Sequence, residues 1–432
     1  MNYTRSELFP GVWLTHLKND KFKTACLSIN LLTQLDRETA SMNALIPFVL
    51  RRGTTQYDSM EKLSARFDEL YGTDIEPVVR RIGEVQALGF FASFPEQSYL
   101  PGEELLLREV TELTAQLLLS PVTRGGLLLP SYVDSEKKKL ADIIRSQVNN
   151  KRSYAIRRCI EEMCCYEAYS VDRYGTAEQC EEISYKKLTK QYRALVMKCP
   201  VEIFYCGCSE EKELKAALTE ALATMPRGEI DYDVGTDVRM NAVEDHVRYV
   251  EEEMDVTQGK LAIGFRFGDC MEEPDVPALL VFNSVFGSGT GSKLFANVRE
   301  RLQLCYYASS LCYYRKGILL AHSGISFDKF EAARDEILAQ LEAIKNGEIS
   351  DEELSIAKKS VSSDLRTTLD SQFDLESFWL GQTVDGTDCG PMEYAELAEN
   401  VTKKQIIDIA RGVECDLIYF LKGGGETEDA ED

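Results

Sequence analysis

The order of strands and helices that the sequence predicts for the first half of the chain recurs in the second half. Each half begins with extended apolar segments, continues through a very apolar helix, and closes on a strand made almost wholly of apolar residues. These segments are residues 10–35, 38–52 and 200–208 in the first half, and residues 260–267, 275–286 and 415–423 in the second. Between them lie further strand pairs, at 75–95 and 306–326, and helices, at 59–71, 103–119, 134–166, 210–224, 328–346 and 351–373. The repeated order predicts two copies of one α+β unit.

A chain of 432 residues is long for a single hydrophobic core. We therefore expect an N-terminal domain over residues 1–225 and a C-terminal domain over residues 248–425. The stretch 226–247 is polar, acidic and weakly periodic, which is typical of an interdomain linker. Residues 426–432 form an acidic tail that we expect to be disordered.

Charge and cysteine usage narrow the function classes. The net charge of −23 argues against nucleic acid or anionic membrane as a partner, because both attract basic surfaces. The 13 cysteines are scattered, without the spacing of a zinc knuckle. The N-terminus lacks a hydrophobic signal region, and no apolar run reaches the ~18 residues of a membrane span. We therefore expect free thiols and a cytoplasmic protein.

A glycine-rich stretch is the strongest candidate for a functional site. Glycine occupies every second position from 287 to 291, and Ser292 is suited to cap a short helix that follows. That helix carries Arg299, and a strand begins near Tyr306. The bend between helix and strand can direct both side chains into one cleft, where both are good hydrogen-bond donors to a polarised carbonyl oxygen. By residue type alone, the ordinary alternatives are a solvated arginine and a core tyrosine.

The same glycines do not form a phosphate-binding loop. The pattern G-x-x-x-x-G-K-[ST] fails because Ser292 separates Gly291 from Lys293, and the preceding segment has the pattern of a helix rather than a strand. The sequence also suggests no Ser-His-Asp or Cys-His set.

Residues 292–306 resemble the signature of the C-terminal half of peptidase family M16, the insulinase, pitrilysin and mitochondrial processing peptidase group. The resemblance rests on Ser-Lys-Leu-Phe at 292–295, Arg-Glu-Arg at 299–301 and Leu-Cys-Tyr at 304–306. The family has a glycine where this chain has Gln303. The resemblance implies that Arg299 and Tyr306 contact substrate across a clamshell cavity, with Tyr307 as a weaker substitute.

The first half lacks the zinc motif of this family. In catalytic members the apolar helix carries His-x-x-Glu-His, whose histidines bind zinc and whose glutamate is the general base. Counted back from Gly53-Thr54, the five positions are Ala44, Leu45, Ile46, Pro47 and Phe48. None of these side chains binds zinc or transfers a proton.

The remaining candidate ligands do not replace that motif. The third zinc ligand of the family, a glutamate, aligns with Ile143, or with Asp142 if the alignment slips by one residue. The chain has only three histidines, His16, His246 and His322, and no two share a helix at ligand spacing. We expect His16 to be an ordinary strand histidine and His246 to be solvated, so the sequence predicts no metal site and no cofactor in this chain.

The resemblance as a whole implies two tandem homologous α/β-sandwich domains that form half of a clamshell. Short members of the family pair, and in several heterodimers one chain carries the zinc motif and the other the arginine and tyrosine. The resemblance thus implies a chain that is inactive alone and serves as the non-catalytic subunit, enclosing a peptide, with zinc on a paralogous partner. The alternatives are an inactive scaffold or peptide-binding protein, a homodimer, and an independent enzyme of unknown chemistry.

Overall fold

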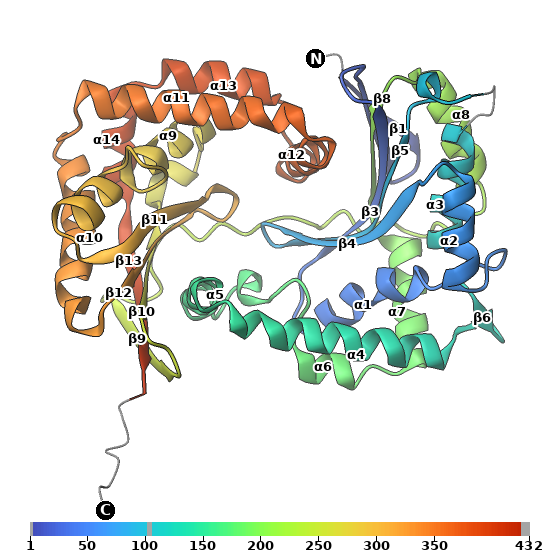
Figure 1. The fold of residues 1–432 in the computed structure, drawn as a ribbon, viewed down its shortest axis with the longest axis horizontal. Coiled ribbons are helices and arrows are strands. Elements are labelled where there is room, and N and C mark those ends of the chain that lie inside the picture. Colours follow the sequence, from blue (N-terminus) through green and yellow to red (C-terminus); the bar gives the residue numbers. More distant parts are fainter. Residues whose placement is uncertain (1–2, 102–105, 425–432) are drawn as a thin grey trace, which may run out of the picture. The chain divides into compact units, whose positions relative to one another are not determined.

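Two compact units make up the chain, each built from one mixed β-sheet and the helices that cover it (Figure 1). The computed structural model describes residues 3–101 and 106–424, so the acidic tail predicted at 426–432 lies outside the described residues. The first unit comprises residues up to 146, 171–235 and 369–390, and the second comprises residues 147–170, 236–368 and those from 391 onward. No helix in the described ranges has the length and apolar character that a membrane span requires.

The first unit contains a six-stranded sheet in the order β1-β2-β8-β3-β5-β4. Strands β2 and β8 are parallel, and the other neighbours are antiparallel. The strands are β1 (Tyr3–Phe9), β2 (Val12–Lys18), β3 (Thr24–Gln34), β4 (Asp74–Ile82), β5 (Val85–Pro95) and β8 (Val201–Gly207), with a separate hairpin of β6 (Thr123–Arg124) and β7 (Leu127–Leu128).

Helices cover both faces of this sheet, and the central strand β3 shows how the sequence allows it. Successive side chains of a strand point to opposite faces. Leu27 and Ile29 belong to the main core, whereas Cys26 packs with Trp379 of a helix on the other face. Both faces are therefore buried, and the polar Ser28 and Asn30 on the second face donate hydrogen bonds to Glu376 of that helix.

The helices of the first unit begin at the polar caps that the sequence supplies. Ser59 and Ser184 each accept a hydrogen bond from the backbone N–H three residues later, at 3.3 Å. The helices are α1 (Ala40–Leu50), α2 (Met60–Glu69), α3 (Leu106–Leu119), α4 (Pro130–Ser146), α6 (Ala177–Glu181), α7 (Tyr185–Lys198), α8 (Glu211–Ala221) and α12 (Gln372–Asp385).

The sheet of the second unit repeats the sheet of the first. Its order is β11-β12-β10-β13-β9, and its neighbours match β4-β5-β3-β8-β2 in position and in direction, including one parallel pair, β9 with β13. The strands are β9 (Arg248–Met254), β10 (Gly259–Arg266), β11 (Cys305–Tyr313), β12 (Ile318–Ile325) and β13 (Glu414–Gly423). The predicted duplication of one α+β unit is confirmed, with β1 as an addition to the first copy.

The helices of the second unit follow the same plan. Helix α9 occupies the place of α1, and both are apolar on nearly every side because both are buried. The helices are α5 (Lys151–Met163), α9 (Val276–Phe286), α10 (Phe330–Lys345), α11 (Asp351–Thr367), α13 (Pro391–Asn400) and α14 (Lys403–Gly412).

The two halves of the chain exchange a helix. Helix α5, from the first half, packs on β10 and β13 of the second unit, and α12, from the second half, packs on β3 and β8 of the first. The segment 134–166 is helical over most of its length, as predicted, but it contains two helices: α4 and α5 belong to different units and are joined by a short 3₁₀ turn at 147–149. The predicted domains are continuous segments of the chain, whereas each unit defined by packing combines several segments. The predicted linker, residues 226–247, contains neither helix nor strand.

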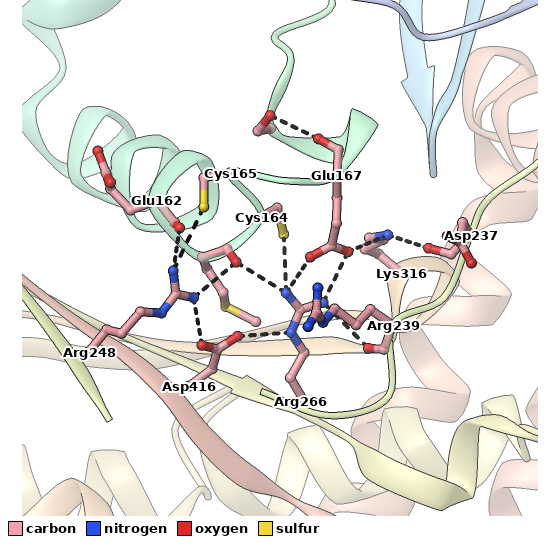
Figure 2. Close-up of polar contacts among 12 residues, drawn as sticks. Glu162, Cys164, Cys165, Glu167, Asp237, Arg239, Arg248, Arg266, Lys316 and Asp416 are labelled. Carbon is pink, nitrogen blue, oxygen red and sulfur yellow. Dashed lines mark hydrogen bonds and ion pairs between the residues drawn. The ribbon is translucent and has the colours of Figure 1, made fainter. Parts of the chain in front are cut away.

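Buried charges hold α5 to the second unit. Figure 2 shows Arg266 between two carboxylates, with Nη2 at 2.6 Å from Glu167 Oε1 and Nε at 3.0 Å from Asp416 Oδ2. Arg248 reaches the other oxygen of Asp416 at 2.6 Å, and Lys316 reaches Glu167 Oε2 at 2.6 Å. The side chains of Arg266 and Asp416 are fully buried, so each depends on the others for its solvation.

The same cations bind the C-terminal end of α5. The carbonyl oxygen of Met163 accepts hydrogen bonds from Arg248 and Arg266, at 3.1 and 3.2 Å, and that of Glu162 accepts one from Arg248 at 3.0 Å. The last carbonyls of a helix have no partner within it and carry partial negative charge. Arg248 and Arg266 therefore fix the C-terminal end of α5 in the second unit. From its position in the sequence alone, α5 would be assigned to the first unit.

Candidate functional site

The glycine-rich stretch lies in the second unit, after α9. Gly289 has φ +98°, a conformation that favours glycine. Ser292 Oγ accepts a hydrogen bond from the N–H of Phe295 at 3.3 Å, so it satisfies the start of the next segment as predicted. That segment, Leu294–Arg301, is the short helix predicted from the sequence and has π-helical geometry, which is frequent at functional sites.

Arg299 lies near the end of the π-helix with its guanidinium accessible. The group sits 4.8 Å from the centre of the Phe295 ring, and its Nε is 3.6 Å from the carboxylate of the adjacent Glu300. The side chain is 43% exposed. Arg299 is therefore oriented by its neighbours without being committed to a buried partner.

Tyr306 lies on the edge strand β11 at an irregularity in the strand pairing. Cys305 pairs with Ile325 and Tyr307 with Gly324, so Tyr306 is the extra residue of a β-bulge. Bulges next to functional sites redirect a side chain away from the regular pleat. Tyr306 is 69% exposed, which is unusual for a tyrosine in an otherwise apolar strand and excludes the core alternative.

Gln303 connects the π-helix to β11 with φ +49°, in the left-handed region that favours glycine. This is the position where the resembled family has glycine. The turn thus keeps the conformation of a glycine turn, at a cost of about 1 kcal/mol for a residue with a Cβ.

We expect Gln303→Gly to raise the free energy of unfolding by about 1 kcal/mol, because it removes this strain. Urea denaturation followed by circular dichroism measures the change. Gln303→Ala, which retains a Cβ, is the matched control and should be close to neutral. Destabilisation by glycine at this position would contradict the argument.

An open hollow of about 1060 Å³ adjoins Tyr306. Its other lining residues come from the start of α5 and the turn from β9 into β10, at positions 149–152, 255–258 and 260. The volume slightly exceeds the ~300–1,000 Å³ typical of ligand sites. Tyr306 is among the residues that line this hollow, and Arg299 is not.

Three cations line the hollow, and they bind only neutral partners among the described residues. Lys151 Nζ lies 2.9 Å from Met254 Sδ, and Lys260 donates to Gln258. Arg152 Nη2 lies 3.4 Å from His322 Nε2.

Tyr307 lies beneath these cations. Its ring is 4.5 Å from the guanidinium of Arg152 and 6.0 Å from Lys260 Nζ. The ring extends across Gly324 of β12, where a Cβ would come within 2.5 Å of Tyr307 Cε1. Burial raises the pKa of Tyr307 to about 12, so it stays a neutral phenol and supports the cations through its ring face.

The positive charge of this region affects two titrating groups. Burial, and then the charge of Arg152, lower the pKa of His322 to about 4. The same two causes lower the pKa of Lys260. At both groups the positive charge of Arg152 adds to the larger effect of burial.

The zinc-motif positions lie in the buried helix α1. Ala44, Leu45 and Ile46 are at most 1% exposed, and Pro47 is inside the helix. Their side chains consist of carbon and hydrogen and do not fit a zinc ion. Among the described residues, no group of three histidine, cysteine, aspartate or glutamate side chains is placed to hold a metal ion.

The other residues considered from the sequence have ordinary surroundings. Ile143 and Asp142 are exposed on α4. His16 lies with Nε2 at 2.9 Å from the carbonyl oxygen of Ser209, and His246 is exposed, as predicted for both. All 13 cysteines are free.

Sequence patterns alone did not identify the three cations of the hollow, Lys151, Arg152 and Lys260. Lys151 and Arg152 begin a helix that was assigned to the first domain, and Lys260 opens a strand more than one hundred residues later. No spacing rule connects them. Only the exchange of α5 brings them together.

Comparisons with known proteins agree with this fold. Residues 182–361 match the family model described as the peptidase M16 inactive domain. The chain is 32% identical over 409 residues to a Bacillus subtilis protein described as the probable inactive metalloprotease YmfF, covering 94% of this chain and 95% of that protein.

Solved structures extend the similarity to the whole chain. A conserved protein from Enterococcus faecalis matches with a TM-score of 0.89 and 25% identity, over 99% of this chain and 100% of that one. A peptidase M16 inactive domain from Pseudomonas fluorescens matches with a TM-score of 0.78 and 15% identity, over 99% of each chain. The match to the inactive-domain family model and the similarity to the Bacillus subtilis protein confirm the prediction that the chain is a homologue of inactive peptidases. The identity of 32% across nearly the whole chain, together with the family-model match, shows that the chain belongs to peptidase family M16.

Proposed function

We propose that this chain is the non-catalytic subunit of a heterodimeric zinc peptidase. Its partner is a member of the same family that carries His-x-x-Glu-His, and the pair encloses a peptide substrate in the cytoplasm. This chain contributes Arg299 and Tyr306 to the substrate and no metal ligand.

The observation that carries the proposal is the exposure of Tyr306. A phenol placed on a bulge and turned to solvent beside a large hollow gains nothing for stability, because an exposed aromatic ring leaves apolar surface in water. It is well placed to donate a hydrogen bond to a bound peptide. In α1, by contrast, hydrocarbon side chains fill the motif positions, and these side chains have no polar atom that could act on a substrate.

The chemistry assigned to this chain is electrostatic. The phenol of Tyr306 and the guanidinium of Arg299 donate hydrogen bonds to the oxygen of the scissile carbonyl as that oxygen gains negative charge. Donors that are positioned in advance stabilise the transition state more than the ground state, typically by about 3–4 kcal/mol each. The two residues thereby complete a site whose proton transfer and metal chemistry belong to the partner.

Co-expression tests the proposal. This chain, carrying an affinity tag, is purified alone and together with a family member from the same genome that keeps His-x-x-Glu-His. Zinc content and cleavage of a quenched-fluorescence peptide set are measured for each preparation.

Zinc and cleavage that appear only in the pair, with both chains required, are the expected result. Zinc and cleavage by this chain alone would contradict the assignment made from Ala44 and Phe48. If no such partner binds or becomes active, the chain is an inactive scaffold or peptide-binding protein. If the chain associates with itself, it forms the homodimer.

A further inference from the structure

We infer that the hollow beside Tyr306 binds carboxylate groups of a peptide, through Lys151, Arg152 and Lys260. The class of ligand is thus a peptide with acidic side chains or a free C-terminus. The inference that the site binds an anion rests on these three cations. The inference that the anion belongs to a peptide rests on the proposed function.

The charges around the hollow are unbalanced. Three cations line it and one carboxylate, that of Asp255, does. Elsewhere in this acidic chain, cations are usually matched: Lys293 lies 2.9 Å from Glu353, and Arg301 lies 2.9 Å from Glu336. A chain of net charge −23 has carboxylates in excess, so three adjacent cations that have no ion pair within residues 3–101 and 106–424 leave room for an anion from outside.

The cations are held in place by neutral groups rather than left to move freely. Arg152 is fixed between the ring of Tyr307 and His322 Nε2, and Lys260 is fixed by Gln258. Such supports hold the side chains in position without neutralising them. Positions fixed before binding lower the entropy lost when a ligand is bound.

The start of α5 adds further donors. Asn150 caps the helix by accepting the N–H of Ser153 at 3.0 Å, while the N–H groups of the first helical turn lack partners within the helix. The partial positive charge of this helix end has the same sign as the three side chains. Burial, and then the charge of Arg152, lower the pKa values of His322 and Lys260 beside this helix end.

A carboxylate suits this arrangement. It accepts hydrogen bonds at both oxygens, and the cations lie at separate points around an open space instead of converging on a closed pocket. A peptide that extends past Tyr306 could place an acidic side chain or its terminal carboxylate there. The site thereby selects where along an acidic peptide the backbone carbonyl meets the phenol.

Fluorescence anisotropy on the chain alone tests the inference, without any zinc-bearing partner. The probes are three short fluorescein-labelled peptides of equal length: one with glutamate side chains and an amidated C-terminus, one neutral with a free C-terminus, and one neutral and amidated. We expect tighter binding of a carboxylate-bearing peptide than of the neutral amidated one. The peptide that is preferred identifies the source of the carboxylate.

Paired variants locate the site. Lys151→Gln/Lys260→Gln should weaken the preferred peptide about tenfold, whereas the exposed pair Lys359→Gln/Lys404→Gln, with the same change in net charge, should alter its affinity by less than about twofold. Lys260→Arg should retain binding, which separates loss of charge from loss of fold.

Two results would overturn the inference: equal affinity for all three peptides, or equal loss in both double variants. The proposed function fails separately, when no zinc-bearing partner gives cleavage. Lysine-dependent carboxylate binding by the chain alone would then still stand.

Discussion

The Arg266→Met variant is expected to lose about 3–5 kcal/mol from the free energy of unfolding of the second unit. Arg266 is fully buried and forms ion pairs with both Glu167 and Asp416. Methionine fills part of the volume but leaves the two buried carboxylates with one cation each, and the carbonyl of Met163 loses a donor. Each carboxylate loses its contact with the fully buried guanidinium, and removing one partner from a buried ion pair costs more than the intact pair contributes, so the effect is large.

Urea denaturation measures the loss, and the positions of the tryptophans make it specific to the unit. Both tryptophans of the chain, Trp13 and Trp379, belong to the first unit. Tryptophan fluorescence therefore follows that unit, while far-ultraviolet circular dichroism follows both. With a slope of about 2 kcal/mol/M, the dichroism transition of the second unit should move roughly 1.5–2.5 M lower.

A surface arginine provides the control. Arg334 lies 2.8 Å from Asp335 on α10, where its side chain is 30% exposed, and Arg334→Met should cost less than about 1 kcal/mol. An equal loss in the two variants would show that the buried cluster has no special role. A fluorescence transition that moves as far as the dichroism transition would show that the two units unfold together.

Much of the fold follows from residue patterns. Apolar alternation and run length identify strands and buried helices, because burial of a side chain depends on its face and the faces repeat every second or every third to fourth residue. This was enough to recognise two copies of one unit. The buried pairing of Arg266 and Asp416 could be predicted as well, because a single charge inside an apolar strand needs a partner when it is buried.

The exchange of α5 and α12 could not be obtained in the same way. The amphipathic pattern of α5 shows which face is buried but not which sheet covers it. Which sheet α5 packs on depends on contacts between residues distant in sequence, such as those of Arg248 and Arg266 with the end of α5. The cationic hollow forms only because α5 packs on the second unit, so it could not be predicted from the sequence. Arg299 and Tyr306, by contrast, lie in one short motif that can be recognised locally.

In the reconstituted pair, Tyr306→Phe should lower kcat by about 10²–10³-fold. The substitution removes one hydroxyl from a side chain that is 69% exposed, so the fold of the subunit is unaffected. The lost hydrogen bond is one that strengthens as the carbonyl oxygen gains charge. For that reason kcat and kcat/KM should fall by similar factors while KM changes little, and zinc should remain bound to the partner. Arg299→Ala should lower turnover in the same way.

Tyr249→Phe is the matched control, because it removes the hydroxyl of another exposed tyrosine of the same unit, 49% accessible on β9. Its turnover should equal that of the unaltered pair. A Tyr306→Phe pair that retains full turnover would remove Tyr306 from the reaction. A rise in KM with kcat unchanged would instead mean that the phenol binds peptide equally in the ground state and the transition state. Tyr306 would then belong with the lysines of the neighbouring hollow as part of a surface that selects the substrate.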